Sequence, residues 1–184
     1  MRIGIIVGST RPGRIGLPMA RWLKEWAVDR TDIETELIDL AEIKLPEFDE
    51  PAHPRLQKYQ NDHTRSFSQT ISRFDAFVVV TPEYNHNPPS ALLNALTFLS
   101  AEWAYKPVAF FSYGGISGGL RAVQACKLVL LALRAVPIFD GIVVPFASQQ
   151  IKDNEFSPND VQLAAAQAMT AELLKMSAAL KQLR

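Results

Sequence analysis

The chain of 184 residues lacks several features that mark particular classes of protein. It has a single cysteine, Cys126, so an internal disulfide is impossible. Cys126 lies among apolar residues of a predicted helix, and we expect a buried structural thiol rather than a nucleophile. The three histidines, His53, His63 and His86, lack metal-ligand spacing. We therefore predict no bound metal.

The sequence also lacks a net charge and a long apolar run. Its 19 basic residues balance 19 acidic ones, which gives no electrostatic bias towards nucleic acid or an anionic membrane. The longest apolar run, over residues 128–133, is far too short to span a bilayer. The start of the chain is not a signal peptide, because a short apolar stretch runs directly into a glycine-rich turn. We expect a cytoplasmic protein with neither a nucleic-acid nor a membrane partner.

What the sequence does have is a regular alternation of apolar strands and helices. We predict strands over 2–7, 33–40, 74–80, 106–113 and 136–145, the last broken at Asp140-Gly141, and helices over 13–29, 89–101, 120–134 and 157–183. The last helix is expected to begin with Ser157 as its N-cap and Pro158 at its first position. Apolar strands alternating with helices predict a parallel sheet covered on both faces. The expected fold is one doubly wound α/β domain over residues 1–184, and the polar, proline-containing segment 41–70 is expected to be a functional or partly helical excursion.

Unusual loops follow the first, third and fourth predicted strands. In an open α/β sheet, ligands bind beyond the carboxyl ends of the strands, where these loops lie. The first loop, residues 8–16 (GSTRPGRIG), has three glycines, two hydroxyls, two arginines and no acid, and it opens a helix. Backbone amides at a helix start favour an anion, so we predict a phosphate there. An ordinary turn with solvated arginines is the alternative.

The spacing within the first loop excludes two familiar phosphate motifs. Gly8 and Gly13 match half of a P-loop, but Arg14-Ile15 stands where a lysine and a hydroxyl are needed, so nucleoside triphosphate hydrolysis is not expected. The dinucleotide pattern G-x-G-x-x-G is also absent, and Asp39, after the second strand, is then only a weak signal of ribose binding.

The second and third loops carry the chemistry of a planar ring site. Residues 82–85 (PEYN) are stiff, aromatic and rich in hydrogen-bonding groups, which suits the polar edge of a flat heterocycle. Residues 112–119 (SYGGISGG) have four glycines, which let the backbone lie against a ring. A proline-rich turn and a flexible connector are the alternatives. One phosphate loop and two ring loops together predict a mononucleotide, and FMN fits such a long glycine-rich platform better than AMP.

These residues resemble the NAD(P)H-dependent FMN reductases of the flavodoxin-like fold, a family with azoreductase-, quinone-reductase- and chromate-reductase-like members. The resemblance covers nearly the whole chain and rests on GSTR, PEYN and YGG occurring in order, each after its expected strand. It implies a five-stranded parallel sheet in the order 2-1-3-4-5, with helices on both faces. Arg14 and Gly16 depart from the serine and asparagine that family members often carry, and Leu93 stands at a position that is often lysine.

The resemblance also implies the cofactor and its contacts. FMN would be bound by Ser9, Thr10, Arg11, Arg14, Ile15 and Gly16 around its phosphate, and by Pro82, Glu83, Tyr84, Asn85, Ser112, Tyr113, Gly114 and Gly115 along its isoalloxazine. NADPH or NADH would supply electrons, and Arg14 near the site favours NADPH. The acceptor would be a small molecule such as a quinone, an azo compound, a metal ion or free flavin.

The flavin would carry the chemistry, so we predict no catalytic protein residue. Glu83 could act as an acid or base by proximity, but we favour a structural role for it. A flavodoxin-type electron carrier is one alternative, although such carriers are usually acidic and this chain has no net charge. A flavin-binding protein without catalysis is the other.

The predicted helix after Pro89 indicates an oligomer. Its apolar residues cover an arc of roughly 220°, whereas a helix packed on one sheet needs a stripe of about 100°. An exposed apolar patch of this kind usually marks an interface, with Leu93 at its centre and Glu83 and Tyr84 at its edge. We expect a homodimer or homotetramer, as the resemblance also implies. The alternative is that residues 41–70 fold over this helix within one chain.

Overall fold

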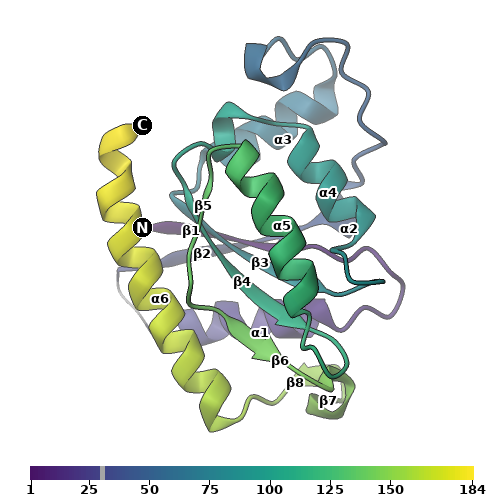
Figure 1. Ribbon diagram of the computed structural model, residues 1–184, viewed down its shortest axis with the longest axis vertical. Helices are drawn as coiled ribbons and strands as arrows, with labels where there is room; N and C mark the ends of the chain where they lie inside the picture. The colour runs from purple at the N-terminus through teal and green to yellow at the C-terminus, as the bar shows by residue number, and fades with distance from the viewer. Residues whose placement is uncertain (30–31) are drawn as a thin grey trace.

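The computed structural model describes residues 1–29 and 32–184. Its parallel sheet has the order β2-β1-β3-β4-β5, with β6 also paired to β4. The strands are β1 (Arg2–Val7), β2 (Glu34–Asp39), β3 (Ala76–Pro82), β4 (Pro107–Tyr113), β5 (Val136–Pro137) and β6 (Ile142–Val144). This is the doubly wound topology expected from the alternating pattern, and Figure 1 shows the helices packed around the sheet.

The central strands are buried along their full length, which is why their sequences are continuously apolar. All seven residues of β3 and all seven of β4 are buried. β3 pairs with β1 on one side, where Val80 lies opposite Val7, and with β4 on the other, where Pro82 lies opposite Tyr113. The carboxyl ends of β1, β3 and β4 therefore meet at one edge of the sheet, and the three loops predicted to bind a ligand start there.

Two hydrophobic clusters fill the space on either side of the sheet. On one side α1 (Gly16–Val28) and α6 (Asp160–Leu180) cover the sheet, with Met19, Leu23 and Leu173 in the cluster. On the other side lie α3 (Asp62–Ser72), α4 (Ser90–Thr97) and α5 (Leu120–Ala132). Figure 1 shows α4 and α5 in front of the sheet and α6 at its left.

Cys126 belongs to the second cluster and is fully buried. Burial raises the pKa of its thiol to about 12. The thiol is therefore protonated at neutral pH, and the prediction of a structural cysteine is confirmed.

The fifth predicted strand is broken over a wider stretch than its sequence indicates. β5 pairs with Pro107 and Val108 of β4, and β6 pairs with residues 111–113. Ile138 still donates its N–H to the carbonyl of Val108, residues 139–141 then leave the sheet, and the side chain of Phe139 is 95% exposed.

The segment predicted as an excursion is partly helical, as expected. It contains most of α2 (Leu40–Ile43), the 3-10 turn η1 (Pro54–Leu56) and most of α3. It packs on α4: Asn94 accepts from the N–H of Phe48 and donates to the carbonyl of Pro46, and the Phe48 and Phe98 rings meet edge to face.

This packing corrects one step of the oligomer argument. α4 ends at Thr97, short of the predicted residue 101, and the 3-10 turn η2 (Ala101–Trp103) follows it. Leu92 and Leu96 on α4, and Phe98 after it, are each at most 1% exposed, so part of the apolar arc is buried within the chain. Leu93, the expected centre of an interface, is only partly buried. Excess apolar surface on α4 therefore gives little support to a dimer.

The closing helix starts later than predicted. α6 runs over 21 residues from Asp160, and its N-cap is Asn159 rather than Ser157. Asn159 accepts from the N–H of Gln162, and the Gln162 side chain accepts from the N–H of Asn159, which completes a capping box. Ser157 instead precedes the helix, with its N–H donated to the carbonyl of Gln150. Among the described residues, no helix is both long and apolar enough to cross a membrane.

The two candidate caps predict different effects of substitution. Asn159→Ala removes an N-cap and should lower the free energy of unfolding by about 1 kcal/mol. Ser157→Ala removes no cap and should change it by less than about 0.5 kcal/mol. Urea denaturation followed by circular dichroism measures both, and equal losses would contradict the assignment of Asn159.

Candidate functional site

The first loop contains several donors that the protein itself does not use. Gly8 continues the sheet, since its N–H donates to the carbonyl of Val80. The N–H groups of Thr10, Gly13 and Ile15 donate to no protein acceptor within residues 1–29 and 32–184. The amino end of α1 follows at once and adds the positive end of its helix dipole. These amides and this dipole suit a phosphate group.

The two arginines of the first loop have different environments. Arg11 is exposed and pairs with no acid in the described part of the chain, so its charge is available to a ligand. Arg14 is largely buried, and its Nη2 lies 2.5 Å from Oδ2 of Asp39. The other oxygen of Asp39 accepts from the N–H of Ala41 at the start of α2. Asp39 thus compensates the charge of Arg14 and anchors the first loop to the end of β2.

Hydroxyl groups connect the first loop to its neighbours. The buried Ser9 Oγ lies 2.7 Å from the hydroxyl of Tyr84 in the second loop. Tyr113, at the end of β4, is buried beneath Gly16, where a Cβ would lie 2.5 Å from the tyrosine hydroxyl. Burial raises the pKa of Tyr113, so this hydroxyl stays protonated at neutral pH. Gly16 is needed here for close packing, and Ile15 beside it packs against the core.

The second loop is a tight hairpin. Tyr84 and Asn87 exchange two backbone hydrogen bonds, and Asn85 and His86 between them have φ values of 50° and 68°. Two left-handed residues in a two-residue turn define the type I′ conformation, which asparagine adopts readily. The hairpin follows the buried Pro82 and leaves Asn85 exposed beside the partly buried Tyr84.

Glu83 points away from the turn and joins the second loop to the third. Its carboxylate accepts from Ser117 Oγ at 2.9 Å and from the N–H of Arg121 at 3.1 Å, and it pairs with Arg121 Nε at 3.1 Å. Burial alone would raise the pKa of Glu83, but these hydrogen bonds and the arginine charge together hold it below its usual value. An ionised carboxylate committed to the start of α5 has a structural role, as we favoured. Arg121 also contacts His86.

The glycines of the third loop differ in their surroundings. Gly114 is packed against Gly119, and its carbonyl accepts from the N–H of Ala147. Gly115 faces open space, since a Cβ there would meet no atom within 4 Å. A side chain at Gly115 would fill that space, which a planar ring could otherwise occupy. Ser112 does not face this opening: it is fully buried on the side of the sheet that α5 covers.

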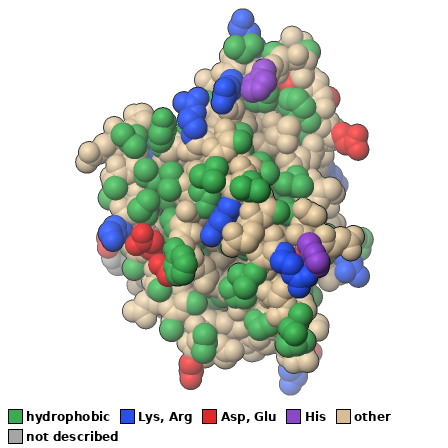
Figure 2. Space-filling view, in the orientation of Figure 1, with side chains coloured by type: hydrophobic (Ala, Val, Ile, Leu, Met, Phe, Trp, Pro, Cys, Tyr) green, Lys and Arg blue, Asp and Glu red, His purple; other side chains and the backbone are tan. Residues whose placement is uncertain are grey.

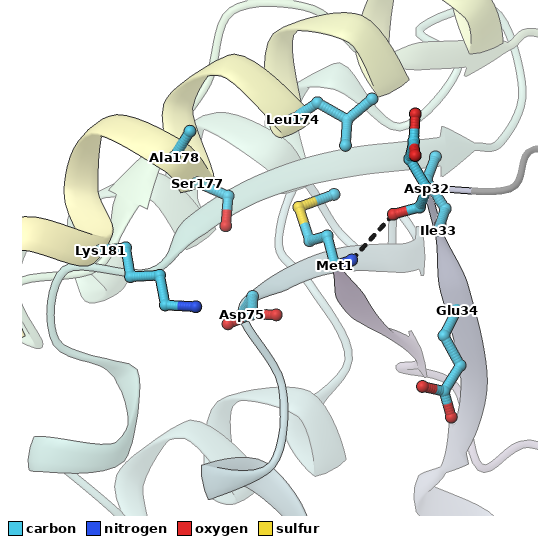
Figure 3. A pocket seen from close by; sticks show the side chains of 9 residues that line it. All are labelled: Met1, Asp32, Ile33, Glu34, Asp75, Leu174, Ser177, Ala178 and Lys181. Carbon is cyan, nitrogen blue, oxygen red and sulfur yellow. Dashed lines mark hydrogen bonds between the residues drawn. The ribbon is translucent and has the colours of Figure 1, made fainter.

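The geometry thus brings together the three loops predicted from the sequence. They join a loop with free backbone amides to an open glycine platform on a doubly wound sheet, an arrangement that suits a flavodoxin-like mononucleotide-binding protein. A larger cavity, of about 710 Å³, lies elsewhere, at the amino ends of the strands between Met1, Asp75 and Lys181 (Figure 3). Size does not decide the site, because that cavity lacks the convergent amides and glycines of the three loops.

The sequence did not predict two sets of contacts in this region. Asp39 was considered only as a ribose ligand, although an acid at the end of a strand beside a loop with two arginines could have indicated an ion pair. Phe146 and Ala147 donate their N–H groups to the carbonyls of Gly115 and Gly114. No local sequence signal predicts these contacts, because they depend on β6 lying beside β4.

Comparisons with known proteins agree with this geometry. The model of the NADPH-dependent FMN reductase family matches residues 1–149. An NAD(P)H-dependent FMN reductase of Schizosaccharomyces pombe is 35% identical over 147 residues, which covers 78% of this chain and 74% of the relative. A second NAD(P)H-dependent FMN reductase, from Saccharomyces cerevisiae, is 33% identical over 156 residues, which cover 78% of this chain and 80% of the relative.

More distant relatives have other names but a related chemistry. A 2-hydroxy-1,4-benzoquinone reductase of Burkholderia is 29% identical over 65% of this chain and 58% of the relative, and an FMN-dependent NADPH-azoreductase of Staphylococcus saprophyticus is 28% identical over 77% and 72%. Among solved structures, a flavoenzyme NAD(P)H:(acceptor) oxidoreductase from Paracoccus denitrificans superposes with a TM-score of 0.73 at 19% identity, over 98% of this chain and 97% of the other.

The chain belongs to the family of NADPH-dependent FMN reductases. It is an oxidoreductase whose cofactor is FMN and whose electron donor is NAD(P)H. The solved structures support the flavodoxin-like fold.

The packing of Gly16 on Tyr113 gives a prediction about the first loop. Gly16→Ala places a methyl group against the tyrosine hydroxyl and should lower the free energy of unfolding by about 1–3 kcal/mol. Adding Tyr113→Phe removes the clashing atom and should recover part of that loss. The control Gly115→Ala meets no neighbour and should change stability by less than about 0.5 kcal/mol. Denaturation of the FMN-free protein measures all three, and a neutral Gly16→Ala would refute the close packing.

Proposed function

We propose that the three loops together bind FMN, with its phosphate in the first loop and its ring along the second and third. The observation that carries this proposal is the set of free amides at Thr10, Gly13 and Ile15, in the loop after β1. The open glycine platform at Gly115 follows β4, and only β3 separates these two strands in the sheet. When bound, FMN accepts a hydride from NAD(P)H and passes the electrons to a second substrate.

The residues of the first loop hold the phosphate by charge and by backbone hydrogen bonds. Arg11 supplies the one uncompensated guanidinium of this loop, and the amides supply neutral donors. Arg14 shapes the loop through Asp39 rather than offering a free charge. For the same reason, Arg14 gives no support to NADPH over NADH.

No protein acid or base is required by the geometry. Glu83 is ionised and bound to Ser117 and Arg121, and Tyr113 is buried with a raised pKa. The protein therefore acts by positioning the cofactor and by leaving the side above Gly115 open to substrates. We infer that the acceptor is a small molecule of the quinone or azo class, which is the class named for several relatives.

A flavodoxin-type electron carrier is the second candidate. Its support is the fold alone, and the balanced charge of this chain, with 19 basic and 19 acidic residues, argues against electrostatic steering of a protein partner.

Substitution of Arg11 tests the phosphate assignment. Loss of a hydrogen bond to a charged group costs about 1.5–3 kcal/mol, so Arg11→Ala should weaken FMN binding by about ten- to a hundred-fold. Riboflavin lacks the phosphate, and its affinity should barely change. Fluorescence titration with both flavins measures the ratio. An equal loss of riboflavin affinity would show that Arg11 supports the fold and does not bind the phosphate.

Reduction by the nicotinamide donor tests the activity. The flavin absorbance of the FMN-bound protein should bleach when NADPH is added without air, and should return when a quinone follows. Because one open face serves donor and acceptor in turn, initial rates should give parallel double-reciprocal lines. A flavin that stays oxidised with both NADPH and NADH would favour the electron carrier, and intersecting lines would require both substrates in the site together.

We also propose that the chain forms a homodimer or a homotetramer. The support now comes from α5, whose outer face carries Leu120, Leu128 and Leu131 at 46%, 71% and 61% exposure. These residues lie on one stripe of the helix with Gln124 between them, and Figure 2 shows hydrophobic side chains gathered over this part of the surface. Apolar stripes of this kind usually mark interfaces.

Charge placed on the stripe tests the dimer. Leu128→Glu combined with Leu131→Glu should convert a dimer into monomers at micromolar concentration, because two buried carboxylates would lack partners. The matched control is Val161→Glu on α6, where the side chain is 77% exposed. Sedimentation equilibrium gives the mass, and a monomeric wild-type protein with FMN bound would rule out the dimer.

Two further expectations belong with this function. We propose that residues 1–184 form a single FMN-binding domain, for which the continuous sheet is the support. We also propose a cytoplasmic location, since the reaction depends on reduced nicotinamide cofactor, an intracellular metabolite.

A further inference from the structure

One residue of the first loop does not fit the role of phosphate ligand that the family resemblance implied. Ser9 has no exposed surface, although the next two residues of the loop, Thr10 and Arg11, are exposed. A side chain without exposed surface cannot touch FMN in this arrangement. The hydroxyl of Ser9 therefore serves contacts inside the protein.

These contacts join the first loop to the second. Ser9 Oγ lies 2.7 Å from the hydroxyl of Tyr84, and within its own loop it accepts from the N–H of Arg11 at 3.4 Å. A serine hydroxyl has one proton and two lone pairs, so it can form both hydrogen bonds at once. The same buried oxygen atom thus holds two segments that are 75 positions apart in the sequence.

Tyr84 is the partner that a ligand can reach. Its side chain is only partly buried, and its backbone exchanges two hydrogen bonds with Asn87 across the hairpin turn. The residue before it, Glu83, is bound to Ser117 in the third loop. The base of the hairpin therefore has two anchors, one to the third loop through Glu83 and one to the first loop through Tyr84.

The surroundings of Ser9 are closely packed. Tyr113, at the end of β4, lies against Gly16, where a Cβ would be 2.5 Å from the tyrosine hydroxyl. Burial raises the pKa of Tyr113, and the Ser9 hydroxyl beside it opposes this rise. Ser9 thus lies next to two tyrosine side chains from different strands, and its loss would leave the Tyr84 hydroxyl without its partner in a partly buried place.

We propose that Ser9 is a positioning residue for FMN rather than a ligand of its phosphate. Through Tyr84 it sets the position of the second loop, and with it that of the isoalloxazine, relative to the phosphate. This inference rests on the proposed binding of FMN by the three loops. Two residues of one loop then have separate roles, since Arg11 supplies charge to the phosphate and Ser9 supplies alignment to the ring.

The test compares Ser9→Ala, Tyr84→Phe and the double variant. Each single variant should weaken binding of FMN and of riboflavin by the same factor, about two- to ten-fold, which is the range of one neutral hydrogen bond. The double variant should be no weaker than the single ones, because both substitutions remove the same bond. Fluorescence titration of the folded, flavin-free proteins measures these affinities.

The spectrum of the bound flavin separates positioning from a general effect on the fold. At saturating FMN the lower affinity no longer matters, so a change in the visible circular dichroism of the flavin reports its surroundings alone. We expect the same change in Ser9→Ala and Tyr84→Phe. The control Thr70→Ala removes a hydroxyl that is bonded to the carbonyl of Ser66 within α3, and it should leave the spectrum and both affinities unchanged.

Three results would overturn the inference alone. A wild-type spectrum in FMN-saturated Ser9→Ala would show that Ser9 only supports the fold, and a loss of FMN affinity without a loss of riboflavin affinity would make it a phosphate ligand. Additive losses in the double variant would show that the two hydroxyls act separately. If Ser9→Ala does not fold, Tyr84→Phe removes the same bond from its partly exposed side. A wild-type protein that binds neither flavin would contradict the proposed function, and this inference with it.

Discussion

The order of the strands is the constraint on which the site depends. Because β1, β3 and β4 are neighbours in a parallel sheet, their carboxyl ends lie side by side, and three loops far apart in the sequence become adjacent. Ser9 and Tyr84 then meet at 2.7 Å, and Glu83 reaches Ser117 and Arg121. A different strand order would leave the same loop sequences without a common ligand.

Charge in this region is largely compensated within the protein. Asp39 pairs with Arg14, and Glu83 pairs with Arg121, so two of the three arginines near the loops are held by carboxylates. Buried or partly buried pairs of this kind contribute more to position than to stability. Arg11 is left with its charge free, and the backbone amides of the first loop add donors without adding charge. An anion is thus favoured at one end of the site, and the ring end stays neutral around Gly115.

The side of the sheet covered by α5 carries a stripe of exposed apolar side chains. The 40–60 segment shields α4, but the stripe on α5 and the ring of Phe139 remain exposed. The break in the fifth strand leaves a pocket next to them, bordered by α5.

The sequence by itself determined the class of fold, the order of the loops and the kind of ligand. Continuous apolar strands can be satisfied only in a sheet covered on both faces, and the glycines and hydroxyls of the loops are local properties that survive without a structure. Other features depended on contacts between distant residues. Asn159 rather than Ser157 caps α6, Asp39 neutralises Arg14, residues near Phe48 cover α4, and Ser112 turns towards α5 rather than the flavin platform. In each case the outcome was set by which partner lay within hydrogen-bonding or packing distance, and that distance exists only once the chain has folded.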